Sequence, residues 1–418
     1  MLNIHLFPPR FVPQRPSPAA TLRRVLLPLA VVFAVLATAG WIAGADTPRP
    51  DAYDAELAAW ERGTVAGEPL PAADAPPERT ARFFAGLLPA QRRRLAERYP
   101  LVVGNMAGAP VRLRFRANRA ALVDARDAER ARMSDPRLSE AGQREAGRRM
   151  HRFESLLRPG RQLLAFDPTG RGRVAEVFGD LETADRVSVV VPGVDTELLT
   201  YERTQGRWTA PAGMAQALYA AELERLPAGG STAVVAWADY DAPAGMAMSA
   251  ATAGRAEAGA ERLVDAVAAL PGDGGVALFC HSYGSVVCGV AAEELPSRVS
   301  DITVAGSPGM RASHVSELGT DARVWAMRAR GDWIEDVPHM ELGPLGFGTD
   351  PLDPSFGARL LDAGAAEGHS AYFEPGGVGL ASMAAIGTGD AGRVDDTVCA
   401  PDVRGCAASA PCAAVGGL

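Results

Sequence analysis

Ser282 lies in the segment FCHSYGS (279–285), between a short apolar run and a helical run. A strand, a tight turn with a central serine and a helix are the layout of a nucleophile elbow, in which the serine Oγ stands clear at the carboxyl end of a sheet. Cys280 replaces the first glycine of the usual G-x-S-x-G pattern. Cysteine is small enough for the close passage of strand and helix, although we expect some crowding that lowers activity. The segment predicts Ser282 as a catalytic nucleophile.

A serine nucleophile needs a base, normally a histidine that a carboxylate holds in place. In this kind of elbow the chain order is serine, then acid, then histidine. His369, in the glycine-led loop EGHSAY (367–372), is the favoured base, and His339, which follows Val337-Pro338, is the alternative. The other four histidines are set aside for their positions: His5 before the apolar N-terminal run, His151 in a helical region, His281 beside the nucleophile, and His314 ahead of the acid.

Asp332 is the candidate acid, because it follows a glycine just after the apolar run 324–327. A carboxylate at the end of a strand can reach across to a histidine loop. Glu335 and Asp336, in the same segment RGDWIEDVP (330–338), are the alternatives. The residues therefore predict a triad of Ser282, Asp332 and one histidine.

Acyl transfer also needs backbone N–H groups that hold the developing oxyanion. The N–H of Tyr283, directly after the nucleophile, is the first expected donor. The segment PGVDT (192–196) follows the apolar run 187–191 and is expected to supply the second. Gly193 would let the backbone approach the substrate there, and the N–H of Val194 is the candidate donor.

Apolar runs of β type alternate with amphipathic helices in the part of the chain that carries these residues. Continuous apolar strands between helices predict an α/β fold with a mostly parallel sheet and helices on both faces. Ligands bind such sheets where the strands' carboxyl ends open. The expected strands are 163–166, 187–191, 233–237, 276–279, 302–305 and 324–327, with helices at about 211–225, 250–269 and 284–295.

The run 25–45 contains no charge and follows four arginines. About 20 apolar residues suffice to span a bilayer as a helix, and the positive-inside rule would leave the N-terminus in the cytoplasm and the catalytic part outside. A signal peptide cleaved after Ala45, giving a secreted protein, is the alternative. The expected organisation is a tail (1–24), this transmembrane or signal segment (25–45), a linker (46–80) with one short helix near 52–62, a helical accessory region (81–160), a catalytic domain (161–390) and a Cys-containing tail (391–418).

Composition excludes some classes of function. The net charge is −8 over 418 residues, which speaks against nucleic acid as a partner. Cys280 and Cys288 are expected to be small, buried apolar residues. Cys399, Cys406 and Cys412 do not have zinc-ligand spacing, and two of them would pair in an exported protein. No metal and no cofactor is expected.

Several separate segments resemble an actinobacterial α/β-hydrolase family of the DUF1023 type. The resemblance covers about 95–380 and implies an α/β-hydrolase fold with a Ser-Asp-His triad. Residue by residue it points to Ser282, Asp332 and His369, with Cys280 as the departure, and it implies no known substrate. The segments are VVGNMAGAPVRLRFRANRAAL, VVVPGVDT, VVAWADYDAP, FCHSYGSVV, VAGSPGM, VWAMRARGDWIEDVP and GHSAYF.

Together these features predict a membrane-anchored serine hydrolase that cleaves carboxylic esters outside the cytoplasmic membrane. Lipids or acyl groups of the cell envelope are the expected substrates. This expectation rests only on the location outside the membrane and on no residue of a binding pocket. A peptidase or thioesterase with the same triad is an alternative. A non-catalytic envelope-binding protein on a hydrolase scaffold is another, with Cys280 as its support.

Overall fold

The computed structural model describes residues 52–245, 254–337, 339, 341–342, 345–392 and 394. The apolar run 25–45 and the cysteines at 399, 406 and 412 lie outside this part of the chain. Within it, no helix combines the length and the apolar character that a membrane crossing requires. The expected membrane segment and the cleavage after Ala45 therefore stay predictions.

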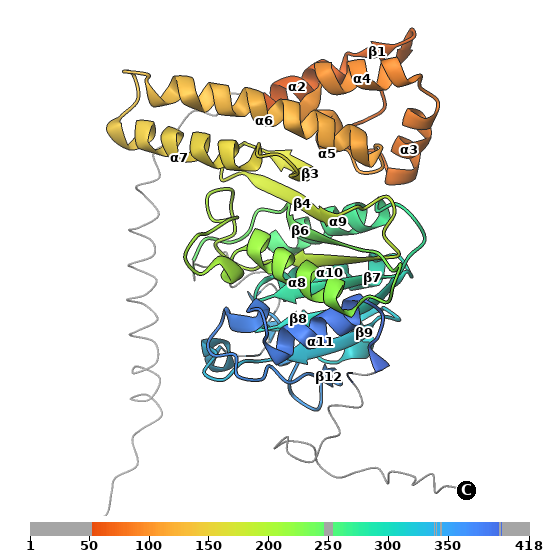
Figure 1. The fold of residues 1–418 in the computed structure, drawn as a ribbon, viewed down its shortest axis with the longest axis vertical. Coiled ribbons are helices and arrows are strands. Elements are labelled where there is room, and N and C mark those ends of the chain that lie inside the picture. The colour runs from red at the N-terminus through yellow and green to blue at the C-terminus, as the bar shows by residue number, and fades with distance from the viewer. Residues whose placement is uncertain are drawn as a thin grey trace, which may run out of the picture. The chain divides into compact units, whose positions relative to one another are not determined.

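One sheet of eight strands forms the centre of the fold, in the order β12-β9-β8-β7-β5-β6-β4-β3 (Figure 1). The six strands from β12 to β6 pair in parallel, whereas β4 runs antiparallel to both β6 and β3. The prediction of a mostly parallel sheet is confirmed. The strands are β3 (Gln162–Asp167), β4 (Arg173–Gly179), β5 (Arg186–Val191), β6 (Thr232–Ala238), β7 (Val276–His281), β8 (Val299–Ala305), β9 (Arg323–Met327) and β12 (Arg359–Leu360).

Strand β4, like the two-residue strand β12, is a member of the sheet that the apolar runs do not predict. Its sequence is interrupted by Glu176, which is 2% exposed. Arg161 and the hydroxyl of Tyr201 both hydrogen-bond this carboxylate, so its charge is paired inside the protein. The partners lie 15 and 25 residues away along the chain, and a strand pattern read locally does not reveal them.

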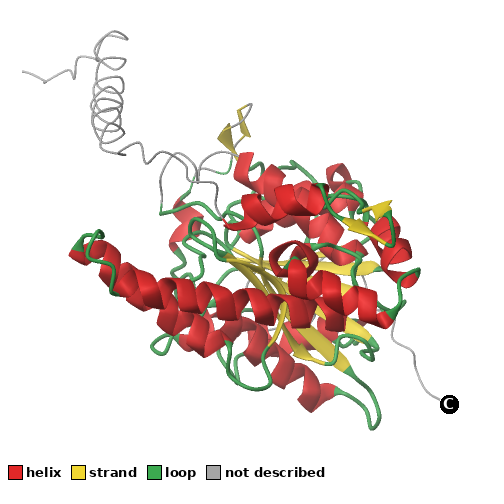
Figure 2. Cartoon of the chain, turned by 90° about the horizontal axis from the view of Figure 1, so that it is seen from above, coloured by secondary structure: helices red, strands yellow, loops and turns green. Residues whose placement is uncertain are grey.

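Helices cover both faces of the sheet, as Figure 2 shows. On one face α9 (Gly254–Ala268) contacts α10 (Gly284–Ala291), and on the other α8 (Pro211–Arg225) contacts α11 (Val378–Gly387). Alternate side chains of a strand point to opposite faces. Val189 of β5 accordingly packs in the core on the side of α9 and α10, and Val190 packs in the core with α8 and α11.

A helical region precedes the sheet along the chain and packs beside β3, where Figure 1 shows α6 and α7 side by side. It contains α2 (Ala52–Glu61), α3 (Pro77–Ala85), α4 (Pro89–Arg98), α5 (Pro100–Asn105), α6 (Val111–Met133) and α7 (Glu140–Leu156). Ion pairs such as Arg149–Glu129 and Arg130–Glu154 link α6 to α7.

The part of the expected linker that the structure describes, residues 52–80, contains the one helix expected near 52–62, which is α2, but it is otherwise more ordered than expected. It carries α2, a hairpin of β1 (Thr64–Val65) and β2 (Glu68–Pro69), and the start of α3. Trp60 is fully buried in the hydrophobic core of the helical region, where its ring packs against that of Tyr99. Its indole N–H donates to the carbonyl of Pro71 at 2.7 Å. Burial of this large side chain is what holds a Pro- and Ala-rich segment in place.

Candidate active site

Ser282 lies at the sharp turn between β7 and α10, with a φ of +55°. This left-handed conformation is rare for a residue with a Cβ and costs about 1–2 kcal/mol, so the surroundings must impose it. The Ser282 N–H donates to the carbonyl of Ala305 on β8 at 3.0 Å. A Cβ at Gly284 would lie 2.3 Å from the carbonyl oxygen of Val191, so helix and strand pass too closely there for any other residue.

Cys280 and Cys288 form a disulfide across this turn. Cys280 is in β7 and Cys288 in α10, and their Cα atoms are 6.5 Å apart, within the range that a disulfide requires. Both are buried, as expected, but the bond between them was not predicted. Eight residues separate them, and the first turns of the helix bring residue 288 back over the end of the strand. Cys280 is thus a covalent tether of the elbow, and not merely a tolerated substitute for glycine.

His369 contacts Ser282 directly. Its Nε2 lies 2.8 Å from the Ser282 Oγ, and its Nδ1 lies 2.7 Å from Oδ1 of Asp332. A carboxylate can only accept, so Nδ1 carries the proton and Nε2 is left to accept one from the serine. The indole of Trp333 lies against the imidazole, with ring centroids 4.5 Å apart. The structure therefore brings together the three residues that the sequence selects.

Asp332 is fully buried at the start of the 3-10 helix Trp333–Asp336. Burial by itself would raise the pKa of this carboxyl, but hydrogen bonds from His369, from Tyr372 and from the backbone N–H of Ile334 outweigh it and hold the pKa below its ordinary value. The group is a carboxylate at neutral pH. It can fix the tautomer of His369 and stabilise an imidazolium there.

Two further residues complete the network and were not singled out by the sequence. The hydroxyl of Tyr372 donates to Oδ2 of Asp332 and accepts from the N–H of Ala329 at 3.0 Å. The Nε2 of His281 lies 2.6 Å from the carbonyl oxygen of His369. Burial lowers the pKa of His281 to about 4, so its ring is neutral and donates this hydrogen bond. Tyr372 follows His369 by three residues and His281 precedes Ser282, and this proximity is the only sequence signal for either.

The alternative residues lie elsewhere. The Nδ1 of His339 bonds the carbonyl of Pro308 at 3.0 Å, and its Nε2 lies 3.7 Å from Asp350. Glu335 and Asp336 are exposed, whereas Asp332 is not.

The loop with Val194 lies against the nucleophile. A Cβ at Gly193 would be 2.6 Å from the Ser282 Cβ, so only glycine fits there. The hydroxyl of Tyr240 donates to the carbonyl of Pro192 at 2.6 Å, and Oδ1 of Asp195 accepts from the N–H of Gly245 at 2.7 Å. The loop is therefore held from both sides. Val194 stands one residue beyond the contact with Ser282, and Tyr283 follows Ser282 in the turn.

The described residues contain no group of three or more His, Cys, Asp or Glu side chains that could hold a metal ion. The chemistry that their arrangement supports is proton transfer from a serine to a histidine, with a buried carboxylate behind it.

Sequence comparison finds a family and several relatives. The profile of a family described as alpha/beta hydrolase matches residues 167–342. An uncharacterized protein of Mycobacterium tuberculosis is 31% identical over 222 residues, which are 50% of this chain and 80% of the relative. A second uncharacterized protein of that species is 27% identical over 381 residues, covering 77% of this chain and 57% of the relative.

Solved structures show only a loose likeness. Dienelactone hydrolase from Anabaena variabilis is 16% identical, with a TM-score of 0.32 over 53% of this chain and 92% of its own. Naproxen esterase from Bacillus subtilis is 12% identical, with a TM-score of 0.29 over 63% of this chain and 100% of its own. On the profile match, together with the relative that is 31% identical over 80% of its own length, the chain belongs to the alpha/beta hydrolase family.

Proposed function

We propose that the protein is a serine hydrolase that cleaves carboxylic esters through an acyl-enzyme. One observation carries the proposal: Ser282, His369 and Asp332 form a continuous hydrogen-bonded series, with contacts of 2.8 and 2.7 Å. His369 takes the proton of Ser282 as the Oγ attacks the ester carbonyl, then returns it to the leaving alcohol. A water molecule, activated by His369 in the same way, then attacks the acyl-enzyme and releases the carboxylic acid. The N–H groups of Tyr283 and Val194 are the proposed oxyanion donors.

We propose further that the enzyme acts outside the cytoplasmic membrane, on esters of lipids or of the cell envelope. The uncharged run 25–45 behind four arginines supports this location. The Cys280–Cys288 disulfide supports it independently, because such bonds persist in oxidising compartments. Since the disulfide assigns a structural use to Cys280, that residue no longer favours a non-catalytic scaffold.

Hydrolysis of a panel of p-nitrophenyl esters, from acetate to palmitate, tests the proposal. We expect turnover by the wild type and a loss of at least about 1,000-fold in kcat for His369→Ala. His339→Ala is the matched control, and its activity should stay within a few-fold of the wild type. Matching amides and thioesters separate the peptidase and thioesterase alternatives. Equal activity of His369→Ala and the wild type would refute the proposed mechanism.

A further inference from the structure

A cavity of about 330 Å³ lies between the helical region and the sheet domain, apart from the catalytic residues. Its walls come from α2, from residues 72–75, from the end of α5, from α6, from the residue after β6, and from α9. None of Ser282, Asp332 and His369 lines it. Its volume is within the range of small-molecule sites.

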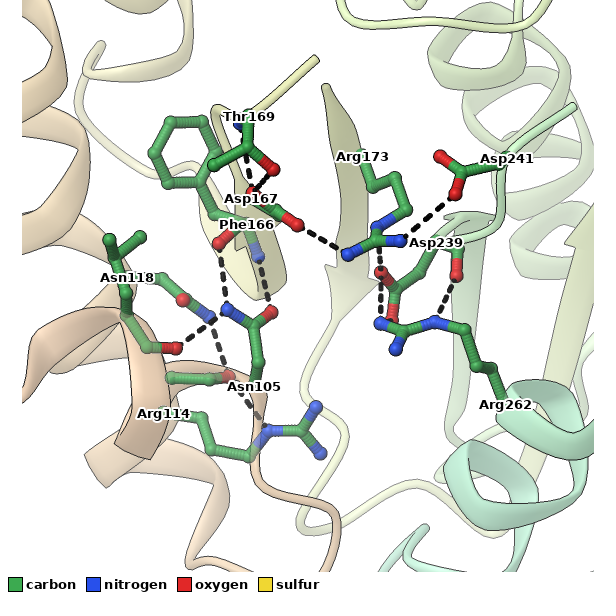
Figure 3. A network of polar contacts seen from close by, with 12 residues as sticks. Asn105, Arg114, Asn118, Phe166, Asp167, Thr169, Arg173, Asp239, Asp241 and Arg262 are labelled. Carbon is green, nitrogen blue, oxygen red and sulfur yellow. Dashed lines mark hydrogen bonds and ion pairs between the residues drawn. The ribbon is translucent and has the colours of Figure 1, made fainter. Parts of the chain in front are cut away.

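Arg114 of α6 is the most unusual side chain in the cavity wall. It is 5% exposed, and its only hydrogen bond to the described part of the chain runs from Nε to the carbonyl of Gly104, at 3.2 Å. Figure 3 shows the two terminal nitrogens without a partner, pointing toward Arg262 and Asp239. Burial lowers the pKa of Arg114 to about 10, so the group is still charged at neutral pH. A buried cation with four unused N–H donors calls for an acceptor.

Among the described residues, none accepts a hydrogen bond from these terminal nitrogens. Asp239, the buried carboxylate nearby, already accepts two hydrogen bonds from Nη2 of Arg262, at 2.7 and 2.8 Å. The Nε of Arg173 is 3.8 Å from the same carboxylate. Asp239 is therefore paired with Arg262, and among the described residues that line the floor of the cavity Arg114 is the cation without an ion-pair partner.

The residues at the mouth of the cavity carry negative charge. Glu61, Asp74 and Asp265 all line it and all are exposed. Acidic groups at the entrance disfavour a multiply charged anion, and they favour a ligand that carries a cationic group toward the solvent. Tyr53, Leu57 and the Ala side chains between floor and rim offer apolar contact to the ligand's carbon atoms.

We propose that this cavity binds a small zwitterionic carboxylate of the amino-acid or short-peptide type. The carboxylate pairs with Arg114, for which a planar, two-oxygen acceptor is the best geometric match. The ammonium group faces the acidic rim. The site goes beyond the proposed hydrolysis, since it uses none of the catalytic residues.

Isothermal titration of the full chain with L-lysine and two analogues tests this proposal. L-lysinamide replaces the carboxylate by a neutral amide, and hexanoate keeps the carbon chain and carboxylate without either amine. We expect L-lysine to bind, and both analogues to bind at least about tenfold more weakly. Absence of L-lysine binding, or equal binding of either analogue, would overturn the proposal.

Variants locate the site. Arg114→Gln should weaken L-lysine binding at least about tenfold, whereas Arg116→Gln, on the exposed side of the same helix, should leave it unchanged. Asp265→Asn at the rim offers a second variant that disturbs no buried group, and it should weaken L-lysine but not hexanoate. Undiminished L-lysine binding in Arg114→Gln would overturn the assignment. Because the readout is binding, its result is independent of whether the protein hydrolyses esters.

Discussion

The Nε2–H of His281 donates a 2.6 Å hydrogen bond to the carbonyl oxygen of His369. The residue before the nucleophile therefore holds the backbone of the residue whose ring contacts that nucleophile. The two imidazole centroids are 5.0 Å apart, and the ring of Tyr372 lies 5.7 Å from that of His281. Burial keeps this ring neutral by lowering its pKa to about 4, and the bond places the single proton of the neutral ring on Nε2.

The burial of the His281 ring makes the fold sensitive to acid, because a charged imidazolium is costly to bury. Because the pKa of His281 falls from about 6.5 in the unfolded chain to about 4 in the folded one, its contribution to stability is complete above pH 6.5 and declines as pH falls toward 4. His281→Gln keeps a donor but cannot be protonated. Urea unfolding should show that the wild type loses about 2 kcal/mol more than this variant between pH 6.5 and 5. His151→Gln, an exposed control, should follow the wild type, and parallel pH profiles for all three proteins would contradict the prediction.

Tyr372 should matter for the rate of catalysis. Tyr372→Phe removes the hydroxyl that donates to Oδ2 of Asp332, which leaves a buried carboxylate with one fewer partner. We expect kcat to fall roughly tenfold with KM nearly unchanged, since the lost bond supports the base and not the substrate. Steady-state kinetics on a p-nitrophenyl ester measure this. Tyr219→Phe, on α8 outside the site, is the control, and an equal effect in both variants would show that the hydroxyl of Tyr372 has no special role.

The disulfide should stabilise the elbow. Closing a loop of this length contributes about 2–3 kcal/mol by restricting the unfolded chain. The double variant Cys280→Gly/Cys288→Ala restores glycine at the turn and should lose that amount in urea unfolding. A reductant should destabilise the wild type and leave the double variant unaffected, which separates this bond from any other cysteine. A wild type indifferent to reductant would argue against the bond.

Glu222 should have the opposite pH dependence to His281. Burial raises its pKa to about 7, and the hydroxyls of Ser188 and Thr232 only partly offset this. The folded state therefore binds a proton more tightly than the unfolded state, and stability falls as pH rises from 4.5 through 7. Glu222→Gln should gain roughly 2–3 kcal/mol over the wild type between pH 5 and pH 8. Unfolding curves at the two pH values measure it, and a difference that is the same at both would contradict the raised pKa.

Much of the site was predictable because its residues follow strongly apolar strands. The runs 187–191 and 324–327 match β5 and β9 to within a residue at each end. Ser282 and Asp332 then come together because parallel strands present their carboxyl ends at one edge of the sheet. The order serine, acid, histidine left few histidines to choose from.

The remainder depends on contacts between distant residues or on the direction of a side chain. Glu176 interrupts the apolar pattern of β4, and the strand is missed because the residue that pairs with this charge, Arg161, lies outside it. The Cys280–Cys288 bond depends on the rotation of α10 relative to β7, which spacing alone does not give. Beyond the helix expected near 52–62, residues up to 80 have the composition of a linker, and the burial of Trp60 with its hydrogen bond to Pro71 is not evident from that composition.

Labelling with a fluorophosphonate, followed by peptide mass spectrometry, tests the central claim most directly. The reagent forms a covalent bond with an activated serine and reports the residue that reacts. Ser282→Ala should not label, and Ser285→Ala, a control from the first turn of α10, should label as the wild type does. We predict a single adduct on the peptide that contains Ser282. A folded wild type that fails to label, or a Ser282→Ala variant that labels equally well, would contradict the assignment of Ser282 as the nucleophile.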